Sequence, residues 1–369
     1  MAKVNKIVLK NVTICDLHSP YNGKQVDILI ENQKILQIAE HIDDLSAQPH
    51  SFDGALLSPG WIDLQAQLGD PGFEHKEDLL SGLDAAAAGG FTAVCASPLT
   101  APLTDSKSIL EYKLNRARFH LVDILPLGIL TEQGAGKNMA ELFDMHHNGA
   151  VGFTDGKVQL STSILKKSLM YLQQFGGQLM SHPTNASLSA NGQVNESINS
   201  SLTGLKGIPA LGEQLQISHD LGVLQYTGGK LHFSCISTAS AVQLIHDAKK
   251  KGLAVSCDIA AHQVAFDDSV VNTFDTSYKV FPPFRTKDDV AALLKGLIDG
   301  TIDAVCSDHH PEDPEHKNVE FDLASFGIIG LQTAFAVLNT QLKKHLPTDK
   351  IVEKFTAGPR RVLGLPAQT

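Results

Sequence analysis

The sequence predicts a mixed α/β protein, in which a (β/α)8 TIM barrel follows a small N-terminal β-sandwich-like domain. Residues 4–57 contain short β-rich runs, and from residue 56 eight strand-like segments alternate with helix-like ones. Such alternation is typical of a parallel barrel, whose active site lies at the carboxyl ends of its strands. We expect the small domain over residues 1–55, the barrel over 56–345, and a C-terminal segment over 346–369 that returns toward the small domain.

The elements follow from local patterns. A β-rich run at Ile7–Cys15 and a hairpin formed by Val26–Ile30 and Ile35–Ala39 predict the small domain, and Ser51–Leu57 leads out of it. Barrel strands are expected at residues 56–64, 92–97, 122–128, 151–154, 178–181, 230–234, 253–259 and 304–307. Helices are expected at residues 76–88, 106–117, 139–148, 161–174, 210–221, 238–251, 287–297 and 325–339.

Two stretches punctuate this pattern. Gly89 and Gly90 follow the first barrel helix, where glycine commonly ends a helix. Residues 185–201 are rich in Asn and Ser and carry almost no large apolar side chains. We expect this polar stretch to be a long mobile loop.

The composition excludes several classes of protein. The formal charge of −10 argues against a nucleic-acid partner and against an anionic membrane surface. Five scattered cysteines, four of them in apolar strand-like runs, predict buried free thiols in a reducing compartment. The N-terminus lacks the pattern of a signal peptide, and the apolar runs are too short to span a membrane. We therefore expect a cytoplasmic protein.

The end of the first barrel strand carries the most informative residues. Gln65 and Gln67 are two apart on an extended chain, so their side chains point to the same side, toward the barrel mouth. A metal hydrolase would place two histidines here, because neutral imidazole is a good zinc ligand. A glutamine amide offers a hard neutral oxygen instead. Two hydrogen-bonded polar residues at the barrel mouth are the plainer interpretation.

Several motifs in this order resemble dihydroorotase, in the type I, multifunctional-complex branch of the amidohydrolase superfamily. They are Pro59–Asp63, Asp70–Gly72, Lys76–Asp78, Ala85–Thr92, Asp299–Ala304, Phe326–Leu331 and Ala357–Leu365. The resemblance covers nearly the whole chain. It implies a barrel of the metal-dependent hydrolase type that opens or closes the cyclic amide of dihydroorotate in pyrimidine biosynthesis, using one or two zinc ions.

The resemblance assigns six positions to the metals and the proton shuttle, and three keep the family residue: Asp155, His182 and Asp308. Asp308 would be the catalytic proton shuttle and, with the other two, a metal ligand. The His-x-His pair is replaced by Gln65 and Gln67. Cys235 stands at a histidine position, where it is either a fourth metal ligand or a small apolar core residue.

The positions that would bind the substrate are replaced as well. The family arginine that pairs with the dihydroorotate carboxylate is Gly69, and the asparagine of a Pro-Asn-Thr motif is Leu99. A second asparagine becomes Phe281, and a histidine becomes Glu312, whose charge would repel an anion. The resemblance also implies further strands of the small domain after Leu365, so that domain is either reduced or completed by residues beyond this sequence.

These losses predict a catalytically inactive dihydroorotase-like protein with a structural or assembly role. Aspartate transcarbamoylase or another protein subunit is the expected partner, and the resemblance favours a homodimer. On this reading no metal cofactor is needed. The alternative is an active cyclic amidohydrolase with an altered zinc site on Asp155, His182, Asp308 and Cys235. A third hypothesis is a small-molecule sensor that uses the old pocket without chemistry.

Overall fold

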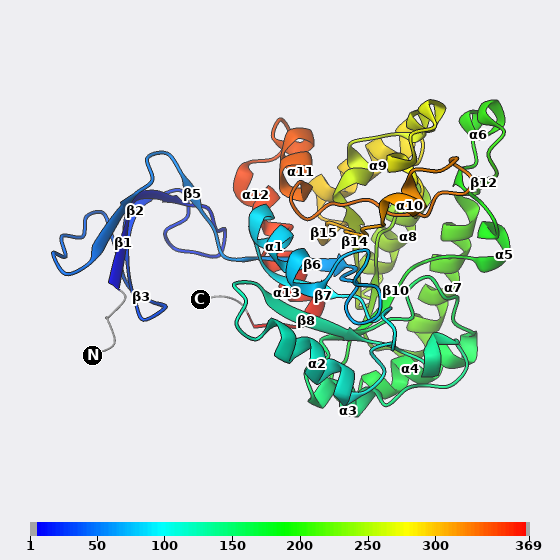
Figure 1. Ribbon diagram of the computed structural model, residues 1–369, viewed down its shortest axis with the longest axis horizontal. Helices are drawn as coiled ribbons and strands as arrows, with labels where there is room; N and C mark the ends of the chain where they lie inside the picture. The colour runs from blue at the N-terminus through cyan, green and yellow to red at the C-terminus, as the bar shows by residue number, and fades with distance from the viewer. Residues whose placement is uncertain (1–5, 367–369) are drawn as a thin grey trace.

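The computed structural model describes residues 6–366 of the 369-residue chain. A separate N-terminal β domain stands beside a larger α/β barrel, as Figure 1 shows. The barrel strands pair in one continuous parallel order, β6-β7-β8-β9-β10-β13-β14-β15, in line with their order along the chain. The predicted fold class is confirmed.

The N-terminal domain is a mixed five-stranded sheet. Its strands are β1 (Lys6–Ile14), β2 (Gln25–Glu31), β3 (Lys34–Ala39), β4 (Gln48–Ser51) and β5 (Leu56–Leu57). The predicted hairpin corresponds to the antiparallel pair β2–β3, while β4 and β5 run parallel to β1. Asp27 is buried and accepts hydrogen bonds from the backbone of Asn11 and Ile42 at 3.0 Å each, which ties β2 to its neighbours.

The barrel is nearly closed by contacts between its first and last strands. Its strands are β6 (Trp61–Ala66), β7 (Phe91–Ala96), β8 (Asp123–Gly128), β9 (Gly152–Phe153), β10 (Leu179–Ser181), β13 (Leu231–Phe233), β14 (Val255–Ala260) and β15 (Ala304–Cys306). The backbone N–H of Gln67 donates to the carbonyl of His309 at 2.7 Å. The Asp63 carboxylate accepts from the Ser307 backbone and hydroxyl at 2.6 Å each. These contacts join β6 to β15.

A helix follows each barrel strand: α1 (Leu79–Gly89), α2 (Lys107–Ala117), α3 (Leu142–His147), α4 (Thr162–Leu172), α7 (Leu211–Thr227), α8 (Ala239–Lys250), α9 (Lys287–Asp299) and α11 (Ala334–Leu342). Asp78 caps the start of α1 by accepting from two backbone N–H groups, and Gly90, at φ 93°, ends it. The last barrel helix begins at Ala334, nine residues later than the predicted Ser325, because the chain from 318 to 333 runs over the barrel without forming a helix.

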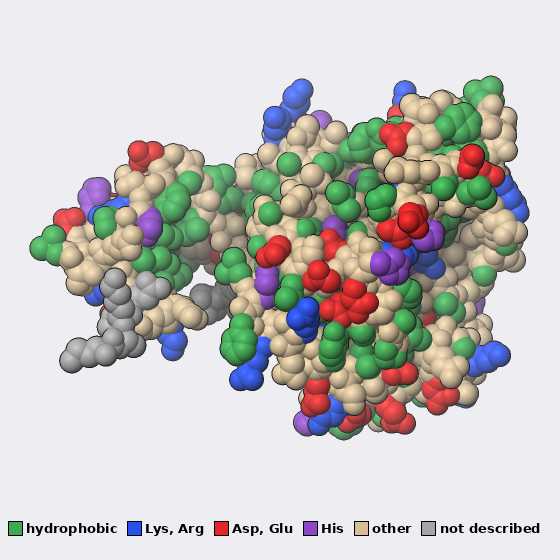
Figure 2. Space-filling view, viewed as in Figure 1, with side chains coloured by type: hydrophobic (Ala, Val, Ile, Leu, Met, Phe, Trp, Pro, Cys, Tyr) green, Lys and Arg blue, Asp and Glu red, His purple; other side chains and the backbone are tan. Residues whose placement is uncertain are grey.

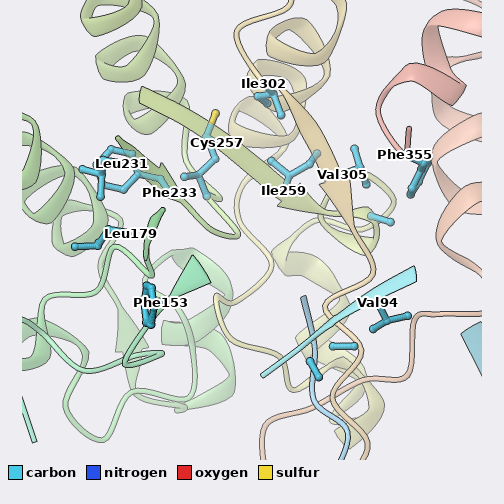
Figure 3. Packing of buried hydrophobic residues seen from close by; sticks show 14 of the residues in the cluster. Val94, Phe153, Leu179, Leu231, Phe233, Cys257, Ile259, Ile302, Val305 and Phe355 are labelled. Atoms are coloured by element: carbon cyan, nitrogen blue, oxygen red, sulfur yellow. The ribbon is translucent and has the colours of Figure 1, made fainter. Parts of the chain in front are cut away.

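The barrel strands place alternate residues on opposite sides of the sheet. Figure 3 shows the side that packs against the helices, where Val94, Phe153, Leu179, Leu231 and Val305 belong to one buried cluster. The intervening residues of the same strands form a second cluster that includes Cys95, Met180, Ala304 and Cys306. Side chains of this second set project into the barrel, below its mouth.

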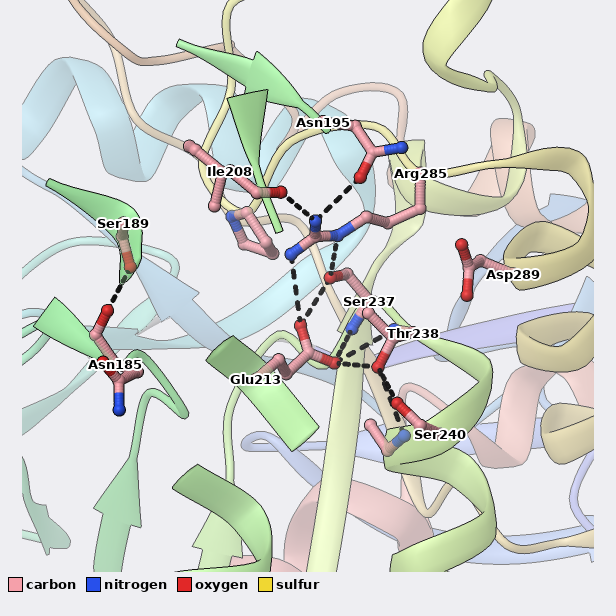
Figure 4. A network of polar contacts seen from close by, with 12 residues as sticks. Asn185, Ser189, Asn195, Ile208, Glu213, Ser237, Thr238, Ser240, Arg285 and Asp289 are labelled. Atoms are coloured by element: carbon pink, nitrogen blue, oxygen red, sulfur yellow. Dashed lines mark hydrogen bonds and ion pairs between the residues drawn. The ribbon is translucent and has the colours of Figure 1, made fainter. Parts of the chain in front are cut away.

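The prediction of a mobile loop at residues 185–201 is wrong. The segment contains α5 (Ala186–Ser189), β11 (Val194–Asn195) and α6 (Ile198–Thr203), and β11 pairs with β12 (Gly207–Ile208). The buried Val194 packs with Val271 and Phe321 in a small apolar cluster, and polar contacts, drawn in Figure 4, add to it. The buried Arg285 guanidinium donates at 2.9 Å to the side chain of Asn195 and to the carbonyl of Ile208.

The same network continues into the barrel. The Arg285 Nε donates to Ser237 Oγ at 3.0 Å, and its other nitrogen lies 3.9 Å from the Glu213 carboxylate. Glu213 also accepts from the backbone N–H groups of Ser237 and Thr238, at 2.9 and 3.0 Å. Arg285 therefore joins the 185–208 segment to the starts of α7 and α8 (Figure 4).

The C-terminal segment packs mainly on the barrel. It forms α12 (Thr348–Glu353) and α13 (Ala357–Leu363), and the Phe355 carbonyl accepts from the Ile62 N–H at 2.8 Å. Contacts also reach the small domain: the Asn22 amide donates to Asp349 at 2.9 Å, and His18 Nε2 lies 3.9 Å from the Glu353 carboxylate. Short elements complete the fold: η1 (Glu132–Gly134), η2 (Ala261–Val264), η3 (Asp268–Thr273), η4 (Thr276–Tyr278) and α10 (Pro314–Lys317).

All five cysteines are buried and free, as the sequence predicts. Over residues 6–366, none of the helices combines the length and the apolar character needed to cross a membrane.

Candidate functional site

A cavity of about 300 Å³ opens at the carboxyl ends of the barrel strands. It is lined by Gln65, Gln67, Ser97, Leu99, Leu127, residues 154–158, His182 and residues 308–310. On the molecular face drawn in Figure 2, acidic side chains gather with histidines and basic side chains over the barrel domain. The fold therefore brings Gln65, Gln67, Asp155, His182 and Asp308 to one cavity, from four separate segments.

His182 and Gln65 are bound to each other. The side-chain amide nitrogen of Gln65 lies 2.8 Å from His182 Nε2. Because an amide nitrogen can only donate, the ring nitrogen accepts and the other ring nitrogen carries the proton. Burial, together with the nearby Lys157 ammonium, lowers the pKa of His182 to about 4. The imidazole is therefore neutral, and its Nε2 lone pair is already used.

Asp155 faces the protein, with both oxygens engaged. One oxygen accepts from the backbone N–H groups of Leu130 and Thr131 at 2.9 Å each, and the other accepts from the Thr131 hydroxyl at 2.5 Å. The carboxylate thus joins the end of β9 to the end of β8. Burial raises the pKa of Asp155, and these three donors oppose that shift.

Asp308 lies just beyond β15 with a left-handed backbone, at φ 45°. It is 9% exposed, and burial raises its pKa to about 7. The Lys157 ammonium and a hydrogen bond from the Cys235 thiol both oppose this rise. The Lys157 ammonium lies 4.5 Å from the centre of the Phe281 ring, which is a cation–π contact. A lysine therefore supplies the positive charge beside Asp308.

Of the four positions expected to bind substrate, only Leu99 lines this cavity. Phe281 lines a neighbouring hollow and makes the cation–π contact with Lys157. Glu312 is turned toward Lys76, at 2.8 Å, and toward His310. His309 and His310 point apart, as expected for two adjacent residues. His309 Nε2 lies 2.7 Å from the Glu77 carboxylate, whereas His310 faces Glu312.

Gly69 sits in a backbone cradle. A Cβ built on it would lie 2.3 Å from the carbonyl oxygen of Phe73 and 2.6 Å from that of Glu77. Real Cβ atoms do not approach backbone this closely, so no side chain fits here unless the 69–77 turn moves. An arginine at this position is excluded by the local fold as well as by the sequence.

A sequence model of the family described as "Dihydro-orotase-like" matches residues 54–241. A dihydroorotase of Pelotomaculum thermopropionicum is 37% identical over 369 residues, which cover 99% of this chain and 86% of the relative. A dihydroorotase of Caldicellulosiruptor saccharolyticus is 38% identical over 366 residues, which cover 97% and 85%. The chain belongs to the dihydroorotase-like family.

Solved structures confirm the amidohydrolase fold. The structure of an L-hydantoinase (dihydropyrimidinase) from Arthrobacter aurescens superposes with a TM-score of 0.85 at 23% sequence identity. The match covers 97% of this chain and 82% of the hydantoinase. This likeness concerns the fold alone.

The zinc ions that the dihydroorotase resemblance implies do not fit the residues at the family positions. Two of the six positions, 65 and 67, are occupied by glutamine. Both Asp155 oxygens accept hydrogen bonds from backbone or hydroxyl donors, and His182 accepts one from Gln65. In the described part of the chain, two groups of three ligating side chains lie within 4.8 Å of one another: Cys235, Asp258 and Cys306, and Glu312, Asp313 and His316. The role of Asp155, His182 and Asp308 as metal ligands stays a prediction.

The site residues predicted from the sequence do not include Lys157, Asp258 or Cys306. One signal was available, because Ser256 and Asp258 interrupt an otherwise apolar strand at alternating positions. Such residues point into the barrel, where a buried carboxylate needs partners. For Cys306, the sequence carried no comparable signal.

Proposed function

We propose that this dihydroorotase-like protein of the pyrimidine pathway does not hydrolyse dihydroorotate and serves as an assembly subunit. The observation that carries the proposal is the bonding of the retained metal-site residues. His182 accepts from the Gln65 amide through the nitrogen that would bind zinc, and Asp155 uses three of its four lone pairs on protein donors.

The reaction demands more than this cavity offers. Hydrolysis of a cyclic amide requires an activated water and a polarised ring carbonyl, which dihydroorotases obtain from their metals. Here Gln65 and Gln67 present amides, and an amide neither binds zinc as well as imidazole nor acts as a base.

Recognition of the substrate is affected as well. An arginine pairs with a carboxylate through two parallel hydrogen bonds, and the Gly69 cradle leaves no room for that side chain. Lys157 offers a single ammonium, and it already lies beside Asp308 and over Phe281. An anionic ring would meet the Asp308 carboxyl without a matched partner for its own charge.

We expect aspartate transcarbamoylase of the same organism to be the partner. The two proteins would be purified separately, mixed, and measured by size-exclusion chromatography with light scattering. A complex of defined stoichiometry supports the proposal, and two unchanged monodisperse peaks count against it. The same experiment on this chain alone reports whether it is the expected homodimer.

Catalysis is tested in both directions, with dihydroorotate and with carbamoyl aspartate. The dihydroorotase of Pelotomaculum thermopropionicum provides the matched positive control at 37% identity. Both proteins are assayed with zinc added and with zinc omitted. A turnover rate within about tenfold of the control would refute inactivity, because a tenfold difference in rate corresponds to only about 1.4 kcal/mol of activation free energy.

A second function is favoured by Asp308. A buried carboxyl with a pKa of about 7, facing a cavity of about 300 Å³, suits proton transfer near neutral pH. It points to a cyclic amidohydrolase with an altered site and a substrate other than dihydroorotate. A panel of cyclic amides and imides tests it: activity that is lost in Asp308→Asn would support this second function over the assembly role.

A further inference from the structure

Two thiols and a carboxylate meet inside the barrel, below the cavity. Cys235 follows β13, Asp258 lies in β14 and Cys306 ends β15, three neighbouring strands. All three side chains are at most 2% exposed. The Sγ atoms of Cys235 and Cys306 are 3.5 Å apart, and Cys306 Sγ lies 3.7 Å from an oxygen of Asp258.

These separations match the edges of a tetrahedral metal site. Zinc binds thiolate sulfur at about 2.3 Å and carboxylate oxygen at about 2.0 Å, so tetrahedral angles place two sulfurs about 3.8 Å apart and a sulfur and an oxygen about 3.5 Å apart. The observed 3.5 and 3.7 Å differ from those edges by a few tenths of an ångström. All three ligand atoms lie within 4.8 Å of one another. A small adjustment would therefore complete the site.

Asp258 is held in place by groups that leave it free to bind a cation. One oxygen accepts from the Cys235 backbone N–H at 2.6 Å, and the other lies 3.0 Å from His232 Nε2. The second ring nitrogen of His232 lies 2.9 Å from the Ser256 hydroxyl. Carboxylate and histidine pairs of this kind commonly orient metal ligands from outside, and each carboxylate oxygen keeps a second lone pair.

The surroundings favour a positive charge. Asp63 and Asp308 are each close enough to Asp258 to interact with it electrostatically. Buried charges in proteins are usually paired or bind metals. Cys235 also lines a hollow of about 20 Å³, large enough for about one water molecule.

We propose that Cys235, Asp258 and Cys306 form a binding site for a thiophilic divalent cation, with zinc as the natural occupant. Of these three, only Cys235 stands at a position that the dihydroorotase resemblance assigns to a metal. Binding would replace the thiol proton on each cysteine, releasing those protons to solvent, and no oxidant or reductant takes part. The site lies deeper than the cavity, and its existence does not depend on the assembly role.

The experiment uses the full chain, produced in cells grown with added zinc or with added cobalt and purified without chelator. Growth with the metal lets the ion enter as the chain folds, because the finished site is buried. Elemental analysis gives the metal content, and X-ray absorption gives the distances from the metal to its ligands. We expect about one ion per chain with two sulfur ligands at about 2.3 Å, and a thiolate-to-cobalt charge-transfer band in the cobalt protein.

Variants assign the ligands. Cys306→Ala and Cys235→Ser should each lower the metal content at least tenfold and abolish the charge-transfer band. Cys257→Ala is the matched control, because that thiol is equally buried but faces the Thr301 carbonyl, outside the cluster. It should keep both the metal and the band.

Several results would overturn the proposal: a metal content below about one tenth of an ion per chain from both media, an ion bound without sulfur neighbours, or full retention by Cys306→Ala. A Cys235–Cys306 disulfide in the freshly purified protein would overturn it too. X-ray absorption on the unmodified chain shows whether sulfur binds the metal, so the proposal can be tested even if a variant fails to fold. Dihydroorotate turnover is measured separately, so failure of this site and failure of the proposed function can be told apart.

Discussion

The closure of the barrel makes stability depend on pH through Asp63. This carboxyl is fully buried between β6 and β15 and accepts from Ser307 twice, at 2.6 Å. Burial raises its pKa to about 7, against about 3.9 for an aspartate in an unfolded chain. The difference of about three pKa units corresponds to about 4 kcal/mol.

The sign follows from which state keeps the proton. Between about pH 4 and pH 7 the native chain holds a proton on Asp63 that the unfolded chain has released. The free energy of unfolding therefore falls as pH rises through this window, by up to about 1.4 kcal/mol per pH unit from this group. The stabilisation is complete below the unfolded pKa and is lost as pH passes the native pKa.

Asp63→Asn removes this titration while keeping the hydrogen bonds. The amide oxygen still accepts from the Ser307 N–H, whereas the bond with the Ser307 hydroxyl reverses, so that the amide nitrogen donates to it as a protonated carboxyl would. Urea unfolding at several pH values is followed by the fluorescence of Trp61, the single tryptophan, which lies in β6. We expect the variant's unfolding free energy to depend less on pH, by about 4 kcal/mol over the window.

The control is Asp105→Asn, because Asp105 is exposed and should leave the pH dependence unchanged. If Asp63→Asn retained the full wild-type slope between pH 4 and pH 7, the burial argument for this carboxyl would be refuted.

Three further predictions concern the site and its support. Arg285→Met should lower the free energy of unfolding by about 3–5 kcal/mol, measured in urea, because it leaves a buried carboxylate unpaired. Gly69→Ala should cost about 1–3 kcal/mol through its clash with backbone oxygens, whereas Gly222→Ala, exposed in α7 with open space around it, should add about 0.5–1 kcal/mol. Lys157→Met should raise the pKa of Asp308 above its value of about 7, read by NMR of the carboxyl carbon, and Lys157→Arg should not.

Local signals in the sequence predicted most elements, and the main error arose where contacts distant in sequence determine the structure. The first barrel helix and its glycine end were predicted within a few residues, because capping is local. The 185–201 segment was misassigned because its partners are distant in sequence: Arg285 and Asp268 bind Asn195, and Val194 packs with Val271 and Phe321. The composition of the stretch could not show which distant residues it would contact.

The candidate site divides in the same way. The replacement of histidines by Gln65 and Gln67, and the survival of Asp155 and His182, were visible in the sequence. Their bonding was not, because the partners of these side chains come from other strands. The pairing of Cys306 with a second thiol was hidden for the same reason.

The sequence by itself determined the alternating strands and helices, the membership of the dihydroorotase-like family and the identity of each residue at the barrel mouth. The tertiary structure alone decided which lone pairs are already in use, which side chains fit beside Gly69 and which thiols meet. Secondary structure and family motifs depend on residues that are close together in the sequence. Hydrogen-bond partners and free volume depend on residues that are far apart in the sequence and meet only in the folded barrel.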